Sequence, residues 1–96
     1  MPRQFFVYIL TNRRRTVLYT GVTGNLPARL ARHQLGIGSR FASRYNVSQL
    51  VYLEPCPGAL QAIAREKQIK AGSRAAKIRL IESINPHWHD LALRGR

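Results

Sequence analysis

The sequence predicts one small α/β (α+β) domain, in which three antiparallel strands are flanked by helices. The chain has 96 residues, the length of a single domain, so we expect residues 1–96 to fold as one unit. Apolar residues make up 45% of the chain and are spread along it, which provides for a core. Three short β-rich runs alternate with stretches of helical spacing, which indicates a sheet that carries helices.

The first half of the chain predicts a β-hairpin followed by a helix. Phe5–Leu10 and Thr16–Val22 are rich in β-branched and aromatic residues, and the polar connection between them is short. Such a connection favours antiparallel pairing. Asn25 can cap a helix with Pro27 in its first turn, and Gly36 can end it.

A third strand and two helices complete the predicted fold. The strand covers Val47–Glu54, and the Pro-Cys-Pro-Gly sequence of residues 55–58 is expected to stop it. Ala59–Lys70 has helical periodicity. Ser73 can cap another helix over Arg74–Ile84, which an Asn-Pro pair then ends.

The charge of the chain predicts a polyanionic partner. Lys and Arg number 16 against 4 Asp and Glu, for a net charge of +12. Nucleic acid is the favoured partner, because counterion release rewards basic contacts with phosphates. A membrane partner is disfavoured, since no segment is a basic helix with a bulky aromatic face. An arginine-rich codon bias would explain the charge without any partner.

Cysteine usage and hydropathy indicate the compartment. Cys56 is the single cysteine, so the chain can form no internal disulfide and no cysteine zinc site. The apolar run Phe5–Leu10 is too short for a signal sequence or a membrane span. We therefore expect a cytoplasmic protein.

One carboxylate lies among apolar residues on a helical wheel. Ala62, Ile63, Glu66 and Ile69 share one side of the predicted helix. A buried carboxylate needs a partner, and two kinds are open. The first is an arginine in a structural ion pair. The second is a hard cation such as Mg²⁺, which often takes only one or two protein carboxylates.

Two tripeptides and three longer stretches carry a resemblance that covers nearly the whole chain. Phe6-Val7-Tyr8 and Tyr19-Thr20-Gly21 come first, and "GNLPARLARH", "AIAREKQIK" and "LIESINPHWHDL" follow in that order. The set resembles the GIY-YIG nuclease superfamily, in particular its small single-domain bacterial members. Phe6 and Thr20 replace the glycine and isoleucine of the family name, whereas both tyrosines and Gly21 remain.

The resemblance implies a GIY-YIG-like fold and hydrolysis of nucleic-acid phosphodiesters with one divalent metal, Mg²⁺ or Mn²⁺. Glu66 would be the metal ligand. By position, the resemblance implies catalytic roles for Tyr8, Tyr19, Arg29, His33, Glu66 and Asn85.

The residue types suit that reaction. We expect Tyr8 to take the proton from water and Tyr19 to orient water or phosphate, with nearby cations lowering the phenol pKa from about 10. Arg29 can clamp the phosphate, and His33, one helical turn on, could relay a proton. Gly21 would let backbone or substrate approach closely.

The leading hypothesis is a metal-dependent endonuclease, acting on DNA in preference to RNA, in repair or processing. Its expected nucleic-acid contacts are basic residues: Arg29, Arg32, Arg40, Arg44, Lys67 and Lys70. The alternative is a nucleic-acid-binding module with little or no cleavage, and a third is a structural role in an RNA–protein assembly. The tyrosines also fit ordinary strand positions, and residues 13–15 fit a solvated turn as well as a phosphate contact. Trp88 is expected to anchor the tail on the core.

Overall fold

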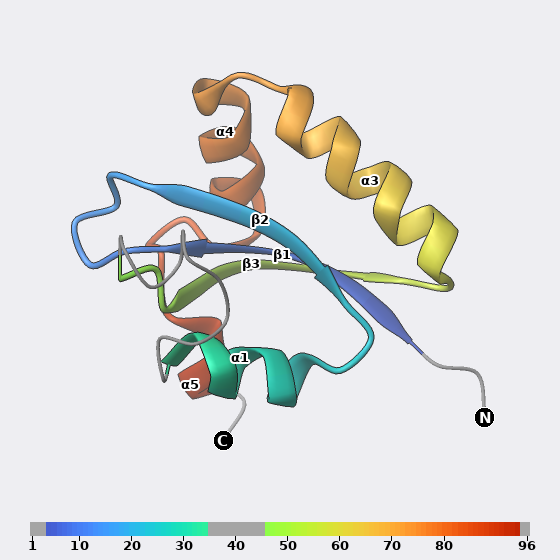
Figure 1. The fold of residues 1–96 in the computed structure, drawn as a ribbon. Helices are drawn as coiled ribbons and strands as arrows, with labels where there is room; N and C mark the ends of the chain where they lie inside the picture. The colour runs from blue at the N-terminus through green and yellow to red at the C-terminus, as the bar shows by residue number, and fades with distance from the viewer. Residues whose placement is uncertain (1–3, 35–45, 95–96) are drawn as a thin grey trace.

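Three strands form one antiparallel sheet with helices on both of its faces, as the sequence predicts (Figure 1). The computed structural model describes residues 4–34 and 46–94, without the side chains of residues 33, 34, 93 and 94. The elements are β1 (Phe5–Thr11), β2 (Leu18–Thr23), α1 (Leu26–Gln34), β3 (Gln49–Cys56), α3 (Ala59–Ala71), α4 (Arg74–Ile84) and α5 (Leu91–Arg94). The strand order β2-β1-β3 places β1 in the centre.

The turn of the β1–β2 hairpin is built by Asn12. Its Oδ1 accepts hydrogen bonds from the amides of Thr16 at 2.9 Å and Val17 at 3.2 Å. These amides therefore belong to the turn, and β2 starts at Leu18 rather than at Thr16 as predicted. Side-chain binding of nearby amides is a common reason for asparagine in turns.

The prediction that residues 55–58 stop the third strand is wrong for the first two of them. Pro55 stands opposite Phe6, and Cys56 stands opposite Phe5, so β3 continues to Cys56. β3 is an edge strand, with β1 on one side only. A proline is tolerated on an edge strand because the missing N–H can fall on the unpaired side.

The sheet separates two apolar layers. On the α3 and α4 face, Val7, Ile9 and Val51 pack with helix residues such as Ala62, Ile69 and Ile81. On the α1 and α5 face, the layer contains Tyr8, Leu10, Leu50, Leu30 and Leu91. The alternation along β1 follows from the two-residue period of a strand. Figure 1 shows α3 and α4 above the sheet and α1 and α5 below it.

Local signals for the starts of α1 and α4 are confirmed, whereas Gly36, which was expected to end α1, lies outside the described residues. Asn25 Oδ1 accepts a hydrogen bond from the Ala28 amide at 3.3 Å, and Ser73 Oγ accepts one from the Ala76 amide at 3.0 Å. Trp88 is buried on the α3 and α4 face, as expected for an anchor of the tail. Among the described residues, no helix has both the length and the apolar character that crossing a bilayer requires.

Candidate active site

Tyr8 is buried in the central strand, and its ring lies over Gly21 of β2. The two residues stand opposite each other in the β1–β2 register. A Cβ placed on Gly21 would lie 2.5 Å from Tyr8 Cζ, closer than two non-bonded carbon atoms can approach. Gly21 therefore makes room for a phenol of the same chain. The prediction that this glycine admits backbone or substrate is wrong, because the space is already filled.

Tyr19 lies on the same face of the sheet as Tyr8. It stands opposite Leu10, two residues along β1 from Tyr8, and both tyrosines belong to the same apolar cluster. The sequence expectation of two phenols on one side of the sheet is thus confirmed. Their environments differ, however, because Tyr8 is only 1% exposed and Tyr19 is half-buried.

The pKa of Tyr8 depends on its burial and on three neighbouring groups. Burial is the largest influence on the pKa of Tyr8. The nearby Arg29 guanidinium lowers the pKa and Tyr19 and Glu66 raise it, and together these effects raise it to about 12. Burial disfavours phenolate because a charge loses water in the protein interior. Arg29 therefore lowers this phenol pKa as expected, but in the protein without metal the effect of burial is larger and the pKa of Tyr8 is raised.

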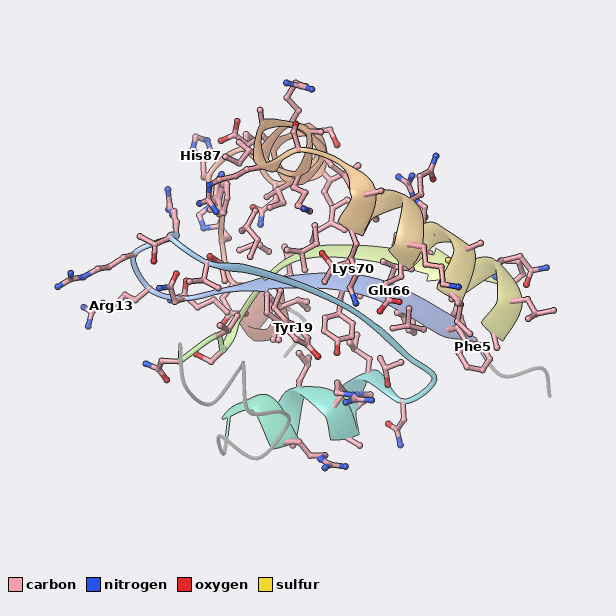
Figure 2. All side chains as sticks on the ribbon, turned by 45° about the horizontal axis from the view of Figure 1, so that its top comes forward. Phe5, Arg13, Tyr19, Glu66, Lys70 and His87 are labelled. Carbon is pink, nitrogen blue, oxygen red and sulfur yellow. The ribbon has the colours of Figure 1, made fainter. Side chains whose placement is uncertain are left out.

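These interactions place the site at the β2 edge of the sheet. Tyr8 and Arg29 belong to the α1 side, whereas Glu66 comes from α3 on the opposite side. α3 packs against both β1 and β2, so its side chains can reach around the edge strand. Figure 2 shows Glu66 and Lys70 pointing from α3 toward the strand that carries Tyr19. The four groups Tyr8, Tyr19, Arg29 and Glu66 thus gather from four elements.

Glu66 has a lysine partner rather than the arginine that the wheel left open. Lys70 Nζ lies 3.4 Å from Glu66 Oε2, one helical turn on. The Glu66 side chain is 20% exposed and that of Lys70 55%, so the carboxylate is sheltered while its partner reaches solvent. Pairs of this kind contribute about 0.3–0.5 kcal/mol, which makes the lysine easy to displace.

The other three acidic residues of the chain each have fixed partners. Each carboxylate accepts hydrogen bonds: Glu54 from Arg65 and Tyr52, Glu82 from the Trp88 indole, and Asp90 from the Leu50 and Ala92 amides. Over the ranges 4–34 and 46–94, no group of three or more His, Cys, Asp or Glu side chains could hold a metal ion. Glu66 is therefore the carboxylate best able to exchange its partner for a cation.

Asn85 is buried away from solvent and bonded entirely to backbone groups. Its Nδ2 donates to the carbonyls of Val51 at 3.0 Å and His89 at 2.9 Å, and its Oδ1 accepts from the His89 amide at 3.0 Å. These bonds tie the end of α4 and the tail to β3. They support a structural role, and the catalytic assignment of Asn85 stays a prediction.

The remaining predicted residues are distributed around the site or fall outside the description. Arg32 on α1 and Lys67 on α3 are exposed. The His33 backbone is in α1, but its side chain is not described. Arg40 and Arg44 lie outside the described residues.

A basic pocket next to Tyr19 was not predicted. It has a volume of about 320 Å³ and is lined by Leu18, Tyr19, Thr20, Lys70 and Lys77. Lys77 comes from α4 and reaches the pocket because α3 and α4 meet at a corner at Gly72. No motif marks Lys77, so only the fold reveals this pocket.

Comparison with known protein families identifies the family of the chain. Residues 4–79 match the GIY-YIG catalytic domain. The chain belongs to the GIY-YIG catalytic-domain family.

Its relatives include proteins that it covers over nearly their whole length. The chain is 38% identical to a UPF0213 protein of Staphylococcus haemolyticus over 77 residues, which are 80% of this chain and 93% of that protein. It is 37% identical to a UPF0213 protein of Natronomonas pharaonis over 81 residues, 84% of this chain and 94% of the relative. The solution NMR structure of the UPF0213 protein BH0048 from Bacillus halodurans is similar with a TM-score of 0.59 and 25% identity, covering 92% and 93% of the two chains. The predicted fold and family are confirmed.

Proposed function

We propose that this protein is a metal-dependent endonuclease that hydrolyses phosphodiester bonds of nucleic acid, with DNA favoured over RNA. The observation that carries the proposal is the convergence of Tyr8, Tyr19, Arg29 and Glu66 at one edge of the sheet. The family of the domain and the net charge of +12 support the same function. We further propose that it works in the cytoplasm, in DNA repair or processing.

The Glu66 carboxylate fits a hard divalent cation, Mg²⁺ or Mn²⁺. It is an oxygen donor in a sheltered position, and its ion-pair partner among the described residues is Lys70, which reaches solvent. A single protein carboxylate is sufficient for such a site when water and phosphate oxygens complete the shell. When bound there, the metal would supply a Lewis acid for the phosphate and its leaving oxygen.

Burial supports a reassignment of the two tyrosines. A base must meet the water whose proton it removes, and Tyr8 is 1% exposed with a pKa of about 12. Tyr19 is half-buried and lines a solvent-accessible pocket. We therefore propose that Tyr19, rather than Tyr8, accepts the proton of the attacking water, and that the Tyr8 hydroxyl supports the site from its buried position near Arg29. The water oxygen then bonds to phosphorus as the bond to the leaving oxygen breaks.

Arg29 of α1 supplies positive charge near the Tyr8 hydroxyl. Its guanidinium is half-buried, and its charge acts on the Tyr8 hydroxyl. A planar guanidinium can donate to two phosphate oxygens at once. Charge that develops on these oxygens in the transition state would be stabilised by the arginine.

One observation favours binding without cleavage as the second candidate. In the protein without metal, the Glu66 carboxylate is paired with the Lys70 ammonium group. Such a site could hold a phosphate on its cationic side without turning it over.

A cleavage assay separates the two candidates. Supercoiled plasmid, branched DNA, single strands and RNA are incubated with and without Mg²⁺ or Mn²⁺, with wild type and with Glu66→Ala. Metal-dependent cleavage that Glu66→Ala lacks supports the nuclease. Equal cleavage by both proteins refutes the site, and equal binding with no cleavage by either supports the second candidate.

A further inference from the structure

The pocket beside Tyr19 is cationic, and the proposed reaction gives a catalytic role to Tyr19 alone among its walls. Its walls are Leu18, Tyr19 and Thr20 of β2, with Lys70 of α3 and Lys77 of α4. Among the residues that the structure describes, two ammonium groups and two hydroxyl-bearing side chains line it, and no carboxylate does. Its volume of about 320 Å³ is within the range of ligand sites and can hold a sugar-phosphate unit.

Lys77 is held in place by backbone oxygen atoms at the end of α3. Its Nζ donates to the Gly72 carbonyl at 3.0 Å and to the Lys70 carbonyl at 3.4 Å. An ammonium group has three donors, so one remains for a ligand. A side chain that is already immobilised loses little conformational entropy when it binds, which favours binding in this pocket.

Lys70 connects the pocket to the candidate metal ligand. It lines the pocket and also lies 3.4 Å from Glu66 through its Nζ. A divalent cation on Glu66 would repel this ammonium, and the pocket next to it could then bind an anion more tightly. Tyr19 borders the same pocket, so an anion there would lie beside the reacting groups.

We propose that this pocket is a second phosphate subsite, which takes the backbone phosphate next to the one that is cleaved. Lys77 is its fixed anchor, and Lys70 moves to it when Glu66 receives a cation. The proposal rests on the proposed nuclease function, because it names the part of the substrate that the pocket takes. Binding energy from a neighbouring phosphate would position the reacting one, so the subsite contributes to turnover.

The first test is binding of a fluorescent DNA oligonucleotide in EDTA over a series of salt concentrations. Lys77→Met should weaken binding and reduce the slope of log K against log salt by about one, the effect of one lost phosphate contact. Arg79→Met is the matched control, because Arg79 is an exposed cation on the same helix and does not line the pocket. Lys77→Arg should retain most of the slope.

Lys77→Met also removes two hydrogen bonds at the end of α3, so thermal unfolding by circular dichroism must accompany the binding data. The second test uses an oligonucleotide set in which one phosphate at a time is an uncharged methylphosphonate. A methylphosphonate at one linkage next to the cleaved one should weaken binding by wild type and by Arg79→Met. It should have no effect on binding by Lys77→Met.

The outcomes separate the subsite from the nuclease function. Equal salt slopes for Lys77→Met and Arg79→Met, or the same methylphosphonate pattern in Lys77→Met as in wild type, would overturn the subsite. Because the first test needs no cleavage, a missing cleavage activity would overturn the proposed function only. A reduced slope for Lys77→Met would then still support a phosphate site.

Discussion

Tyr8 and Gly21 form one structural unit across the two strands of the hairpin. The Tyr8 ring occupies the space that a side chain at position 21 would need, with Cζ 2.5 Å from the Cβ position. The tyrosine of the first tripeptide and the glycine of the second therefore depend on each other. This pairing places the Tyr8 hydroxyl near Arg29 and Glu66.

Gly21→Ala should disturb this unit. The added methyl group forces the Tyr8 ring to move, and overpacking of this kind costs about 1–3 kcal/mol. We expect a loss of that size in the free energy of unfolding by urea. Gly72→Ala is the milder comparison, since its Cβ would make a tight contact with the Ile69 carbonyl at 3.3 Å and an ordinary one with Ala76 Cβ at 3.6 Å, and it should therefore cost less than Gly21→Ala. If both variants are equally stable, the close approach of Tyr8 does not exist.

Tyr8→Phe should change the alkaline stability of the protein. The pKa of Tyr8 rises from 10.0 to about 12 on folding, so its contribution is complete below pH 10 and is lost as the pH rises through 12. At pH 11 the unfolded phenol is mostly ionised while the buried one is still neutral, so the folded state is about 1 kcal/mol less stable than it would be with an unshifted phenol.

The measurement is urea unfolding of both proteins at pH 9 and pH 11. Between pH 9 and pH 11 the Tyr8 phenol ionises in the unfolded chain but not in the folded protein, so wild type loses stability. Tyr8→Phe has no phenol at this position and does not lose that stability. The difference between the proteins should therefore change by about 1 kcal/mol between the two pH values. Parallel pH dependences would contradict the burial of the Tyr8 hydroxyl.

Asn85→Ala tests whether this residue is structural. The substitution leaves buried backbone groups of Val51 and His89 without their partner, which should cost about 2–4 kcal/mol. Ser83→Ala removes an exposed bond to the Leu80 carbonyl and should cost less than about 1 kcal/mol. Unchanged stability of Asn85→Ala together with lost cleavage would instead support the predicted catalytic role.

Arg32→Met should weaken nucleic-acid binding without changing the reaction. Arg32 is exposed on α1, the helix that carries Arg29, and an exposed arginine there can contact a neighbouring phosphate. We expect the salt slope of binding to fall by about one and the single-turnover rate at saturation to stay the same. A lower rate at saturation would mean that Arg32 acts in the reaction itself.

Elements with local causes could be predicted from the sequence. Asn25 and Ser73 cap helices through bonds that span three residues, so their effect is visible in a short stretch. The end of β3 was missed, because the tolerance of Pro55 depends on β3 lying at the edge of the sheet. The start of β2 was missed because Asn12 extends the turn.

The candidate site was predicted in part for the same physical reason. The resemblance identified Tyr8, Tyr19, Arg29 and Glu66, which the fold brings together. The depth of Tyr8 could not be predicted, because burial depends on how α1, α5 and the sheet pack. The Lys77 position depends on the corner between α3 and α4, and no sequence pattern marks it.

The most direct test of the central claim is the single-turnover cleavage rate of Glu66→Gln. This substitution keeps the size of the side chain and removes the charge that would hold a divalent cation. We predict that cleavage with Mg²⁺ or Mn²⁺ becomes undetectable while DNA affinity in EDTA remains, and that Glu82→Gln, on an exposed acid of α4, cleaves like wild type. Cleavage by Glu66→Gln at the wild-type rate would contradict the account.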